Sequence, residues 1–258
     1  MAEFCTVTRD GQILIVTMNR PEKRNAMPAS GHLEMEKIWD QFVADPSLRV
    51  GILTGAGDKA FSAGSDLSGY QSGYDGSLPR TGGCGLTHRL DCRKPIIAAV
   101  NGIAFGGGLE VMLACDMAIA SERAEFSLPE VLVGAGAFGG GIPRLCRKIP
   151  HAIAIELVLT GRRLTAKEAL AFGLVNQLVA PEAVLPAAVA LAKRILRGAP
   201  LASEASKQVA DMALAGMSLE QILIEEDGEP KRRVMSSADI QEGIKAFFEK
   251  RDPRWQGR

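Results

Sequence analysis

Two glutamates occupy positions in which a carboxylate could do acid–base chemistry. Glu110 comes just after a run of glycines in NGIAFGGGLE, residues 101–110, and Glu130 follows a proline in SLPEVLVG, residues 127–134. A glycine weakens a regular element by roughly 0.5–1 kcal/mol relative to alanine, so a glycine run at a helix start calls for another role. Each glutamate also has a purely structural explanation, Glu110 as a helix-dipole partner and Glu130 as a turn residue.

Other local motifs carry less chemistry. The stretch GAGAFG at Gly134–Gly139 matches a dinucleotide-binding pattern, but Pro129 spoils the strand that should precede it, and helix follows where a second strand is required. These glycines are interpreted as tight-turn residues. The three histidines, His32, His88 and His151, stand alone, without a nucleophile or metal-ligand motif, and each is expected to have a surface or packing role.

The elements that would position the glutamates alternate between strand and helix. Strands are predicted at Ile13–Met18, Val50–Thr54 and Ile96–Val100, and Asp10-Gly11 is a hairpin signal. The last two strands are apolar throughout, as in strands covered on both faces. The stretch GHLEMEKIWDQFVAD (31–45) predicts a helix with an apolar face of Leu33, Ile38, Phe42 and Val43. A buried helix running into a short strand is predicted for residues 109–120. The pattern indicates an α/β fold with parallel pairing.

Two further regions differ from this core in composition and in hydrophobic pattern. Gly69–Gly85 is rich in Gly and Ser without a period, and is interpreted either as a mobile lid or as an irregular surface loop. After Pro181 the chain is nearly all helical, with helices predicted at 187–196, 202–215, 219–234 and 238–250. Before it, Thr165 and Glu168 form a capping box and Gly173 is a helix stop.

Composition restricts the function classes. The chain has 258 residues and a formal net charge of zero, which argues against general binding to nucleic acids or anionic membranes. No apolar stretch reaches the length of a membrane span, and the first residues lack signal-peptide features. The five cysteines are scattered without metal-ligand spacing, which favours reduced thiols and a cytoplasmic location. No metal site is expected.

The motifs in their order resemble the crotonase, or enoyl-CoA hydratase/isomerase, superfamily. The matching stretches are FSAGSDL (61–67), NGIAFGGGLEVMLACDMAIA (101–120), AEFSLPEVLVG (124–134) and LTGRRLTAKEALAFGLVNQLV (159–179), and the likeness extends from MNRPEKRNA to the terminal GIKAFFEKRDPRWQG. The resemblance implies a spiral of β-β-α turns followed by a helical region. It also implies an acyl-CoA substrate, with coenzyme A entering only as part of that substrate, and assembly as trimers or pairs of trimers.

The resemblance explains the glycine run. Backbone N–H groups at the positions of Ser65 and Gly107 would form an oxyanion hole for the thioester carbonyl, and glycine lets the backbone approach the substrate. Losing one such donor typically costs about 2.7–4 kcal/mol of transition-state stabilisation, more than a glycine costs the fold. The implied substrate and CoA contacts are Arg24, Ala26, Ala63, Ser65, Asp66, Leu67, Gly106, Gly107, Phe138, Phe247 and Lys250.

The resemblance also assigns the glutamates. Hydratases of this family carry both, and in them the residue matching Glu130 delivers the α-proton while that matching Glu110 holds the water. The leading expectation is therefore an enoyl-CoA hydratase, ahead of an enoyl-CoA isomerase or related acyl-CoA enzyme. A non-catalytic acyl-CoA- or RNA-binding member is the third possibility. The acids of LEMEKIWDQ argue against RNA, and the two glutamates argue against an inactive protein.

One stretch departs from the family pattern. Typical hydratases have Pro-Gly-Ala-Gly-Gly-Thr after the second glutamate, where this chain reads GAFGGGI (136–142). Phe138 is expected either to line the acyl pocket or to anchor the loop in the core. The domain prediction is a catalytic spiral core at 1–195 and an oligomerisation region at 196–258. The latter has apolar faces that include Met212, Leu214, Met217, Leu219, Ile222 and Leu223.

Overall fold

The larger of two sheets forms the centre of the molecule. The computed structural model describes residues 4–68 and 76–258. Six strands lie in the order β1-β2-β3-β5-β7-β10, with β1 and β2 antiparallel and the other described neighbours parallel. Gly11, with a φ of +58°, lies in the β1–β2 turn, so the hairpin prediction is confirmed. The strands are β1 (Cys5–Asp10), β2 (Ile13–Met18), β3 (Val50–Gly55), β5 (Ile96–Val100), β7 (Met117–Ser121) and β10 (Gln177–Val179).

The smaller sheet makes the fold a spiral. It contains β4 (Ala60–Ser62), β6 (Ile103–Phe105), β8 (Glu125–Ser127) and β9 (Leu164–Thr165) in that order. Three successive turns of chain each give one strand to the large sheet and the next to the small sheet: β3 then β4, β5 then β6, β7 then β8. The helix α3 (Gly107–Ala114) follows β6, and the 3₁₀ helix η3 (Pro129–Val133) follows β8. The predicted α/β spiral is confirmed.

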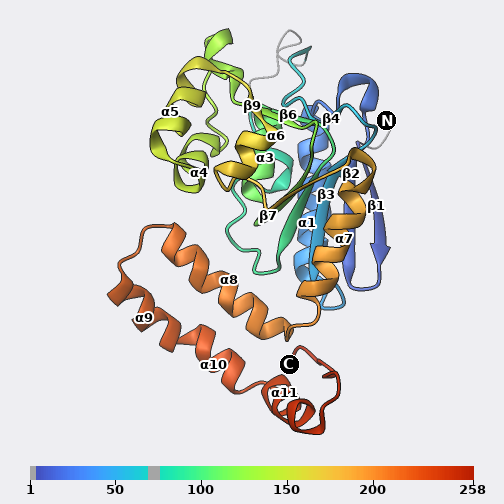
Figure 1. The fold of residues 1–258 in the computed structure, drawn as a ribbon, viewed down its shortest axis with the longest axis vertical. Coiled ribbons are helices and arrows are strands. Elements are labelled where there is room, and N and C mark those ends of the chain that lie inside the picture. Colours follow the sequence, from blue (N-terminus) through green and yellow to red (C-terminus); the bar gives the residue numbers. More distant parts are fainter. Residues whose placement is uncertain (1–3, 69–75) are drawn as a thin grey trace.

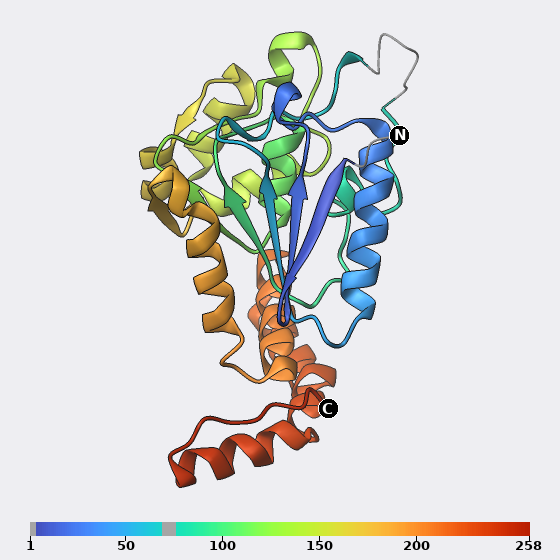
Figure 2. The same ribbon diagram turned by 90° about the vertical axis from the view of Figure 1, so that its right-hand side faces the viewer.

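Two helices cover opposite faces of the large sheet (Figure 2). On one side, α7 (Val184–Ile195) packs its small residues Ala188 and Ala192 against the sheet. On the other, α1 (Ala29–Ala44) buries Met35, Trp39 and Phe42, and also His32. Leu33 was predicted to face the core, but it is 53% exposed. The buried face follows a 32–35–39–42 spacing, and Leu33 lies beside it because each helical residue turns the side chain by about 100°.

The segment between residues 69 and 85 is only partly the loop that its composition predicted. Residues 69–75 lie outside the described chain. Thr81 to Thr87 are buried, and Gly83–Gly85 form a 3₁₀ helix, η2, against α1. The Thr81 hydroxyl donates to Glu36 (2.7 Å), and the Cys84 N–H donates to Nδ1 of His32 (3.0 Å). The lid and surface-loop interpretations are therefore wrong for 81–85, where glycines allow close packing instead of mobility.

The remaining helices of the core cover the end of the spiral. They are α4 (Gly141–Lys148), α5 (His151–Thr160) and α6 (Ala166–Ala171), and Pro150 separates the first two. The capping box of Thr165 and Glu168 is present at the start of α6, and Gly173 lies just beyond its end with a φ of +76°. No helix in the described part of the chain is long and apolar enough to cross a membrane.

The C-terminal helices extend away from the sheets (Figure 1). They are α8 (Pro200–Leu214), α9 (Leu219–Asp227), α10 (Glu229–Met235) and α11 (Ala238–Glu249), and α9 and α10 run back along α8. The single helix predicted for 219–234 is two helices, because the chain bends at Gly228 and Pro230 follows. The predicted boundary at 195/196 falls between α7 and α8, and the division into two domains stays a prediction.

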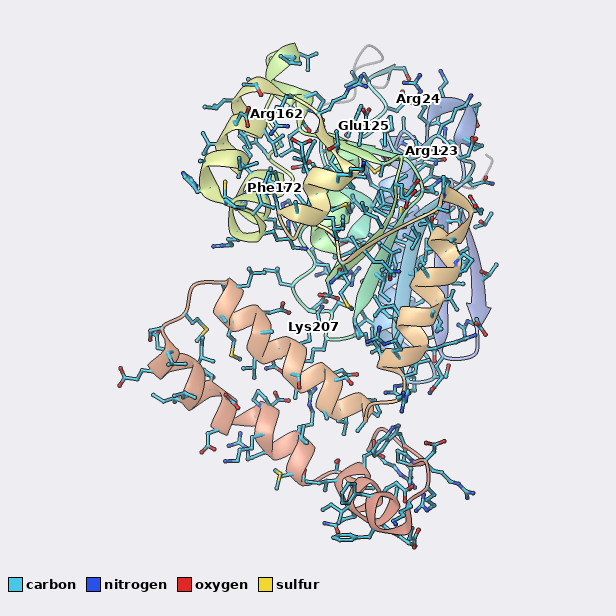
Figure 3. The ribbon with its side chains drawn as sticks, in the orientation of Figure 1. Arg24, Arg123, Glu125, Arg162, Phe172 and Lys207 are labelled. Atoms are coloured by element: carbon cyan, nitrogen blue, oxygen red, sulfur yellow. The ribbon has the colours of Figure 1, made fainter. Side chains whose placement is uncertain are left out.

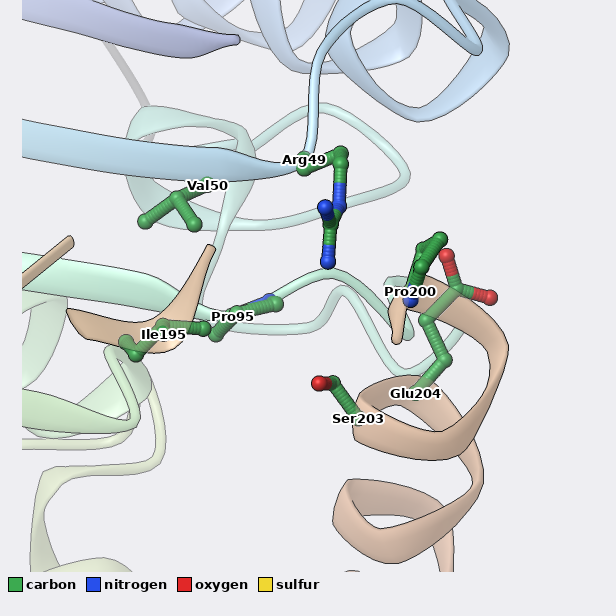
Figure 4. A pocket seen from close by; sticks show the side chains of 7 residues that line it. All are labelled: Arg49, Val50, Pro95, Ile195, Pro200, Ser203 and Glu204. Atoms are coloured by element: carbon green, nitrogen blue, oxygen red, sulfur yellow. The ribbon is translucent and has the colours of Figure 1, made fainter. Parts of the chain in front are cut away.

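Polar contacts attach α8 to the core. Lys207, labelled in Figure 3, makes an ion pair with Asp116 (3.0 Å) and donates to the carbonyl of Cys92 (2.8 Å). Arg49, just before β3, donates to the carbonyl of Gly198 (2.6 Å) just before α8. Figure 4 shows Arg49 in a small pocket at this junction, together with Glu204 from α8. This pocket joins two parts of the chain, at a distance from the glutamates.

Candidate active site

Glu110 is a buried carboxylate held by backbone donors. It lies in the first turn of α3 and is 8% exposed. Its Oε1 accepts a hydrogen bond from the Gly141 N–H (2.9 Å), and the Gly139 N–H also faces it. A Cβ atom at Gly139 would lie 2.6 Å from Glu110 Oε2, so any larger residue there would displace the Glu110 carboxylate. Burial raises the pKa of Glu110, while these N–H groups and the charges of Arg144 and His88 oppose that rise.

Arg144 hydrogen-bonds to the glycine loop 139–141, which contacts Glu110. From α4 it donates to the carbonyl of Thr87 (2.8 Å) and more weakly to the carbonyl of Gly140 (3.4 Å). The guanidinium thereby connects the buried segment 81–87 with the glycines that contact Glu110. Sequence reasoning missed this residue, because an arginine on an amphipathic helix normally indicates a solvated charge.

Glu130 has an unpartnered oxygen. It lies in the first turn of η3, and its Oε2 is buried without a hydrogen-bond partner among residues 4–68 and 76–258. Its Oε1 lies 3.0 Å from where a Cβ of Gly106 would be. Burial raises the pKa of Glu130, and the negative charge of Glu110 raises it further. An unpaired buried polar atom is costly, so its presence favours a role toward a bound molecule.

Two backbone N–H groups, one at the start of α3 and one in the loop after β4, have no acceptor among the described residues. Within the described ranges, neither the Ser65 N–H nor the Gly107 N–H donates to a protein acceptor, whereas the Gly106 N–H donates to the Ser127 carbonyl (2.9 Å). A Cβ on Gly107 would lie 3.6 Å from the Ser65 nitrogen, and a Cβ on Gly64 would lie 3.2 Å from the Gly107 nitrogen. The two free donors are therefore neighbours, and glycine leaves the space between them open.

The loop that carries Ser65 is tied to the turn before α1. Asp66 accepts from Arg20 (3.0 Å), which also donates to the carbonyl of Ala26 (3.0 Å). The Ala63 N–H donates to the carbonyl of Arg24 (2.9 Å). These contacts bring together four of the predicted CoA contacts, Arg24, Ala26, Ala63 and Asp66. Arg24 is labelled near the upper end of the molecule in Figure 3. Leu67, the next residue, is exposed.

Arg20 and Asn25 were not predicted from sequence. Both belong to a turn that reads as ordinary solvated charge. The backbone of this turn is unusual, since Arg24 and Asn25 have φ values of 52° and 54°, in the left-handed region that non-glycine residues rarely adopt. The buried Asn25 side chain donates to the carbonyls of Ala56 and Ala60, and the backbone carbonyl of Asn25 accepts from the Ser62 hydroxyl.

Three predicted contacts lie elsewhere in the chain. Phe138 is 83% exposed, with its ring over Gly136, so the interpretation as a core anchor is wrong. Its backbone is held in a tight loop by a bond from its N–H to the Gly136 carbonyl (2.8 Å), and that loop leads directly into the glycines around Glu110. Phe247 and Lys250 lie on and just after α11, at the opposite end of the molecule from β4 and β6 (Figure 1), so one chain does not bring them to the glutamates.

Alternative sites receive no support from the structure. The glycines at 134–139 follow the 3₁₀ helix η3 instead of a strand, which does not fit a dinucleotide-binding turn. In the described part of the chain, no group of three or more His, Cys, Asp or Glu side chains could hold a metal ion. His32 is a buried packing residue, as one of its expected roles states.

Comparison of the chain with known proteins identifies its family. A family model described as enoyl-CoA hydratase/isomerase matches residues 8–258. The chain is 44% identical to a carnitinyl-CoA dehydratase of Salmonella arizonae, over 100% of both chains. It is 40% identical to an enoyl-CoA hydratase of Mycobacterium tuberculosis H37Rv, with a TM-score of 0.94 and 100% coverage of both. A carnitinyl-CoA hydratase of Mycobacterium avium aligns with a TM-score of 0.79 and 38% identity, again over 100% of both chains. The chain therefore belongs to the enoyl-CoA hydratase/isomerase family, the crotonase superfamily.

Proposed function

We propose that this protein is an enoyl-CoA hydratase, which adds water reversibly across the double bond of a 2-enoyl-CoA thioester. The comparisons support a hydratase or dehydratase of this family. The observation that carries the finer proposal is the pair of glutamates on α3 and η3. Glu110 lies in the first turn of the helix that starts at Gly107, and Glu130 lies against Gly106. A hydration needs two proton-transfer groups on one substrate, together with donors for the negative charge on the thioester oxygen.

The environments of the two carboxyls suggest their roles. Glu110 accepts from backbone N–H groups and feels the charge of Arg144, which favours its carboxylate form. The Oε2 atom of Glu130 has no donor, and the charge of Glu110 favours its protonated form. Burial raises the pKa of both carboxyls; the backbone donors and Arg144 oppose that rise at Glu110, whereas the charge of Glu110 adds to it at Glu130. Two interacting carboxyls in such different environments can serve as base and acid at the same pH. Glu110 is therefore assigned as the base and Glu130 as the acid.

The step then balances as follows. The water oxygen bonds to Cβ while one water proton passes to the Glu110 carboxylate. The electron pair of the C=C bond moves toward the thioester, and the Ser65 and Gly107 N–H groups stabilise the oxyanion. The Glu130 carboxylic acid then gives its proton to Cα. The product is a 3-hydroxyacyl thioester, and one proton exchanged between the glutamates and solvent restores the site.

A second substrate class has support of its own. The relatives named carnitinyl-CoA dehydratase favour an acyl group with a quaternary ammonium, for which the same step runs toward loss of water. Phe138 offers an exposed aromatic ring, and such rings attract cations through their π faces by about 0.5–1 kcal/mol at exposed sites. An isomerase, which moves the double bond of a 3-enoyl-CoA, remains the alternative reaction at this site.

The test is a substrate panel with two variants. Straight-chain and branched 2-enoyl-CoA thioesters, 3-enoyl-CoA thioesters and 4-trimethylammonio-2-butenoyl-CoA are incubated with the protein, and the products are identified by mass spectrometry. We expect 3-hydroxyacyl-CoA products, and a kcat at least about 10²-fold lower in both Glu110→Gln and Glu130→Gln, the lower end for acid–base catalysis. Full activity in either folded variant sinks the proposal. Loss in Glu130→Gln alone, with a shifted double bond as the native product, supports the isomerase.

The CoA part of the substrate is assigned to the loop 63–67 and the turn 24–26, chiefly through backbone groups. Arg24 is the exposed first residue of this turn, and its side chain is proposed to lie near a phosphate of CoA. Calorimetry with CoA tests the assignment. Arg24→Ala should bind CoA more weakly, and an unchanged Kd removes this side chain from the site.

Self-association is proposed for the C-terminal helices, as a trimer or a pair of trimers. Leu219, Leu223 and Ile224 on α9, and Phe247 and Phe248 on α11, are exposed in the single chain. Large exposed apolar groups of this kind mark interfaces. Because α11 is far from the glutamates of its own chain, Phe247 and Lys250 would contact CoA in a neighbouring subunit. Light scattering that gives a stable monomer at micromolar concentration contradicts this.

A further inference from the structure

One buried residue contacts both halves of the oxyanion hole, one half through its backbone and the other through its side chain. We propose that Met27 is a positioning residue that sets the spacing between the Ser65 and Gly107 N–H donors. The inference rests on the hydratase proposal for the use of that hole, and it adds a residue to which sequence analysis gave no role.

The backbone of Met27 holds the Ser65 half. Its N–H donates to the Gly64 carbonyl (2.8 Å), and its own carbonyl accepts from the Asp66 N–H (2.9 Å). Met27 and Ser65 thus form an isolated parallel β-bridge, in which the residues on both sides of Ser65 are bonded and its own N–H stays free. The direction of that free N–H follows from the position of the Met27 backbone.

The side chain of Met27 holds the Gly107 half. Its Cε lies 3.0 Å from where a Cβ of Gly107 would be, so the methyl packs directly against the first residue of α3. The sulfur of Met27 lies against the Cys84 thiol, and Cys84 is bonded through its N–H to His32 on α1. Met27 is 2% exposed, so the side chain is fixed by neighbours on every side. The distance between the donors thereby depends on the length of this one side chain.

A change in the spacing of the donors is expected to lower kcat and to leave KM nearly unchanged. A donor displaced by about 1 Å can lower the rate by about 10²-fold, and complete loss of one donor lowers kcat by about 10²–10³-fold. Met27→Ala should therefore reduce kcat on the accepted enoyl-CoA by about 10–100-fold with little change in KM. Met27→Leu has a similar volume and should keep kcat within about threefold of the native value.

The experiment measures two quantities, the polarisation of a bound thioester by the oxyanion hole and the rate of turnover. The probe is 4-(dimethylamino)cinnamoyl-CoA, whose absorption shifts to longer wavelength when donors polarise its thioester carbonyl. The native protein and Met27→Leu should give the same shift, and Met27→Ala a smaller one. Met18→Ala is the matched control, since Met18 is equally buried in the same core but lies at the end of β2. It should lose thermal stability without changing the shift or kcat.

The outcomes separate the two proposals. If the native protein gives no shift, the oxyanion hole and with it the hydratase proposal fail. If the native protein shifts the probe and Met27→Ala shifts it equally with unchanged kcat, Met27 is only a packing residue. Should Met27→Ala not fold, Met27→Val keeps a smaller buried side chain that is too short to reach Gly107. Met27→Val is then expected to give the reduced shift, and a shift equal to that of the native protein overturns the inference.

Discussion

Acid should destabilise this protein through His32 on α1. The ring is 2% exposed, and burial lowers the pKa of His32 from 6.5 to about 4. In the fold, its Nδ1 accepts the Cys84 N–H, which requires that nitrogen to be unprotonated. A histidine whose folded pKa is depressed contributes stability that is present above the unfolded pKa. That stability is lost as the pH falls through 6.5 toward the folded value.

The magnitude follows from the two pKa values. A difference between 6.5 and about 4 corresponds to about 3 kcal/mol when the titration is complete. At pH 5 the unfolded histidine is almost fully protonated and the folded one is about one-tenth protonated, so about 2 kcal/mol is already lost. The perturbation is His32→Gln, because a glutamine oxygen can accept the same N–H without titrating.

The assay is urea unfolding at pH 8 and pH 5 with one protein concentration throughout. All other titrating groups are common to the two proteins, so their contributions cancel in the difference. The native protein should lose about 2 kcal/mol more than His32→Gln between the two pH values. Equal losses in both proteins would refute the argument, because they would show that His32 titrates normally in the fold.

Four further outcomes are expected. Arg144→Gln removes a charge that opposes the raised pKa of Glu110, so the acid limb of the kcat–pH profile should move to higher pH, whereas Arg144→Lys should leave it in place. Glu130→Gln should raise the Tm at pH 8 but not at pH 4. A carboxyl whose pKa is raised in the fold costs stability when it is ionised, so the gain appears only above that pKa. Each kcal/mol gained is worth about 2–4 °C in Tm. Gly107→Ala should lower kcat by about 10²-fold or more with CoA affinity retained, since its methyl would enter the space between the free donors; turnover near the native rate argues against the hole. Phe138→Ala should change the ranking of substrates by about 5- to 150-fold in kcat/KM, and equal scaling across the panel would exclude the ring from the acyl pocket.

The strands and the principal helices could be predicted because their hydrophobic periods are local. The prediction Ile96–Val100 matches β5 residue for residue, since an unbroken apolar run has few other structures open to it. Leu33 and the segment 81–85 were misassigned for a shared reason. Which face of α1 is buried depends on what packs against it, and the partner is the glycine-rich segment itself. Composition alone indicates freedom of the backbone, but not whether that freedom is used for motion or for close contact.

The site was predictable only where a motif carried it. The two glutamates and the glycine run follow from a resemblance that spans the chain. The structure places Glu130 against Gly106 and Glu110 in the first turn of the helix that starts at Gly107. Arg144 and Met27 could not be found this way, because neither has an unusual sequence context. Their importance lies in what they lie against. Arg144 donates to a carbonyl of a distant segment, and the Met27 methyl lies where a side chain on Gly107 would be.

The free donors of Ser65 and Gly107 belong to the peptide backbone, and this affects how the protein can change. A substitution of the Ser65 side chain leaves its N–H in place, so the group that polarises the thioester is unaffected by most mutations at that position. Side chains that face the acyl group have no such protection and can be exchanged one at a time. A lineage that starts from this architecture can therefore explore new acyl groups by single substitutions, while the chemistry common to all thioesters continues to operate.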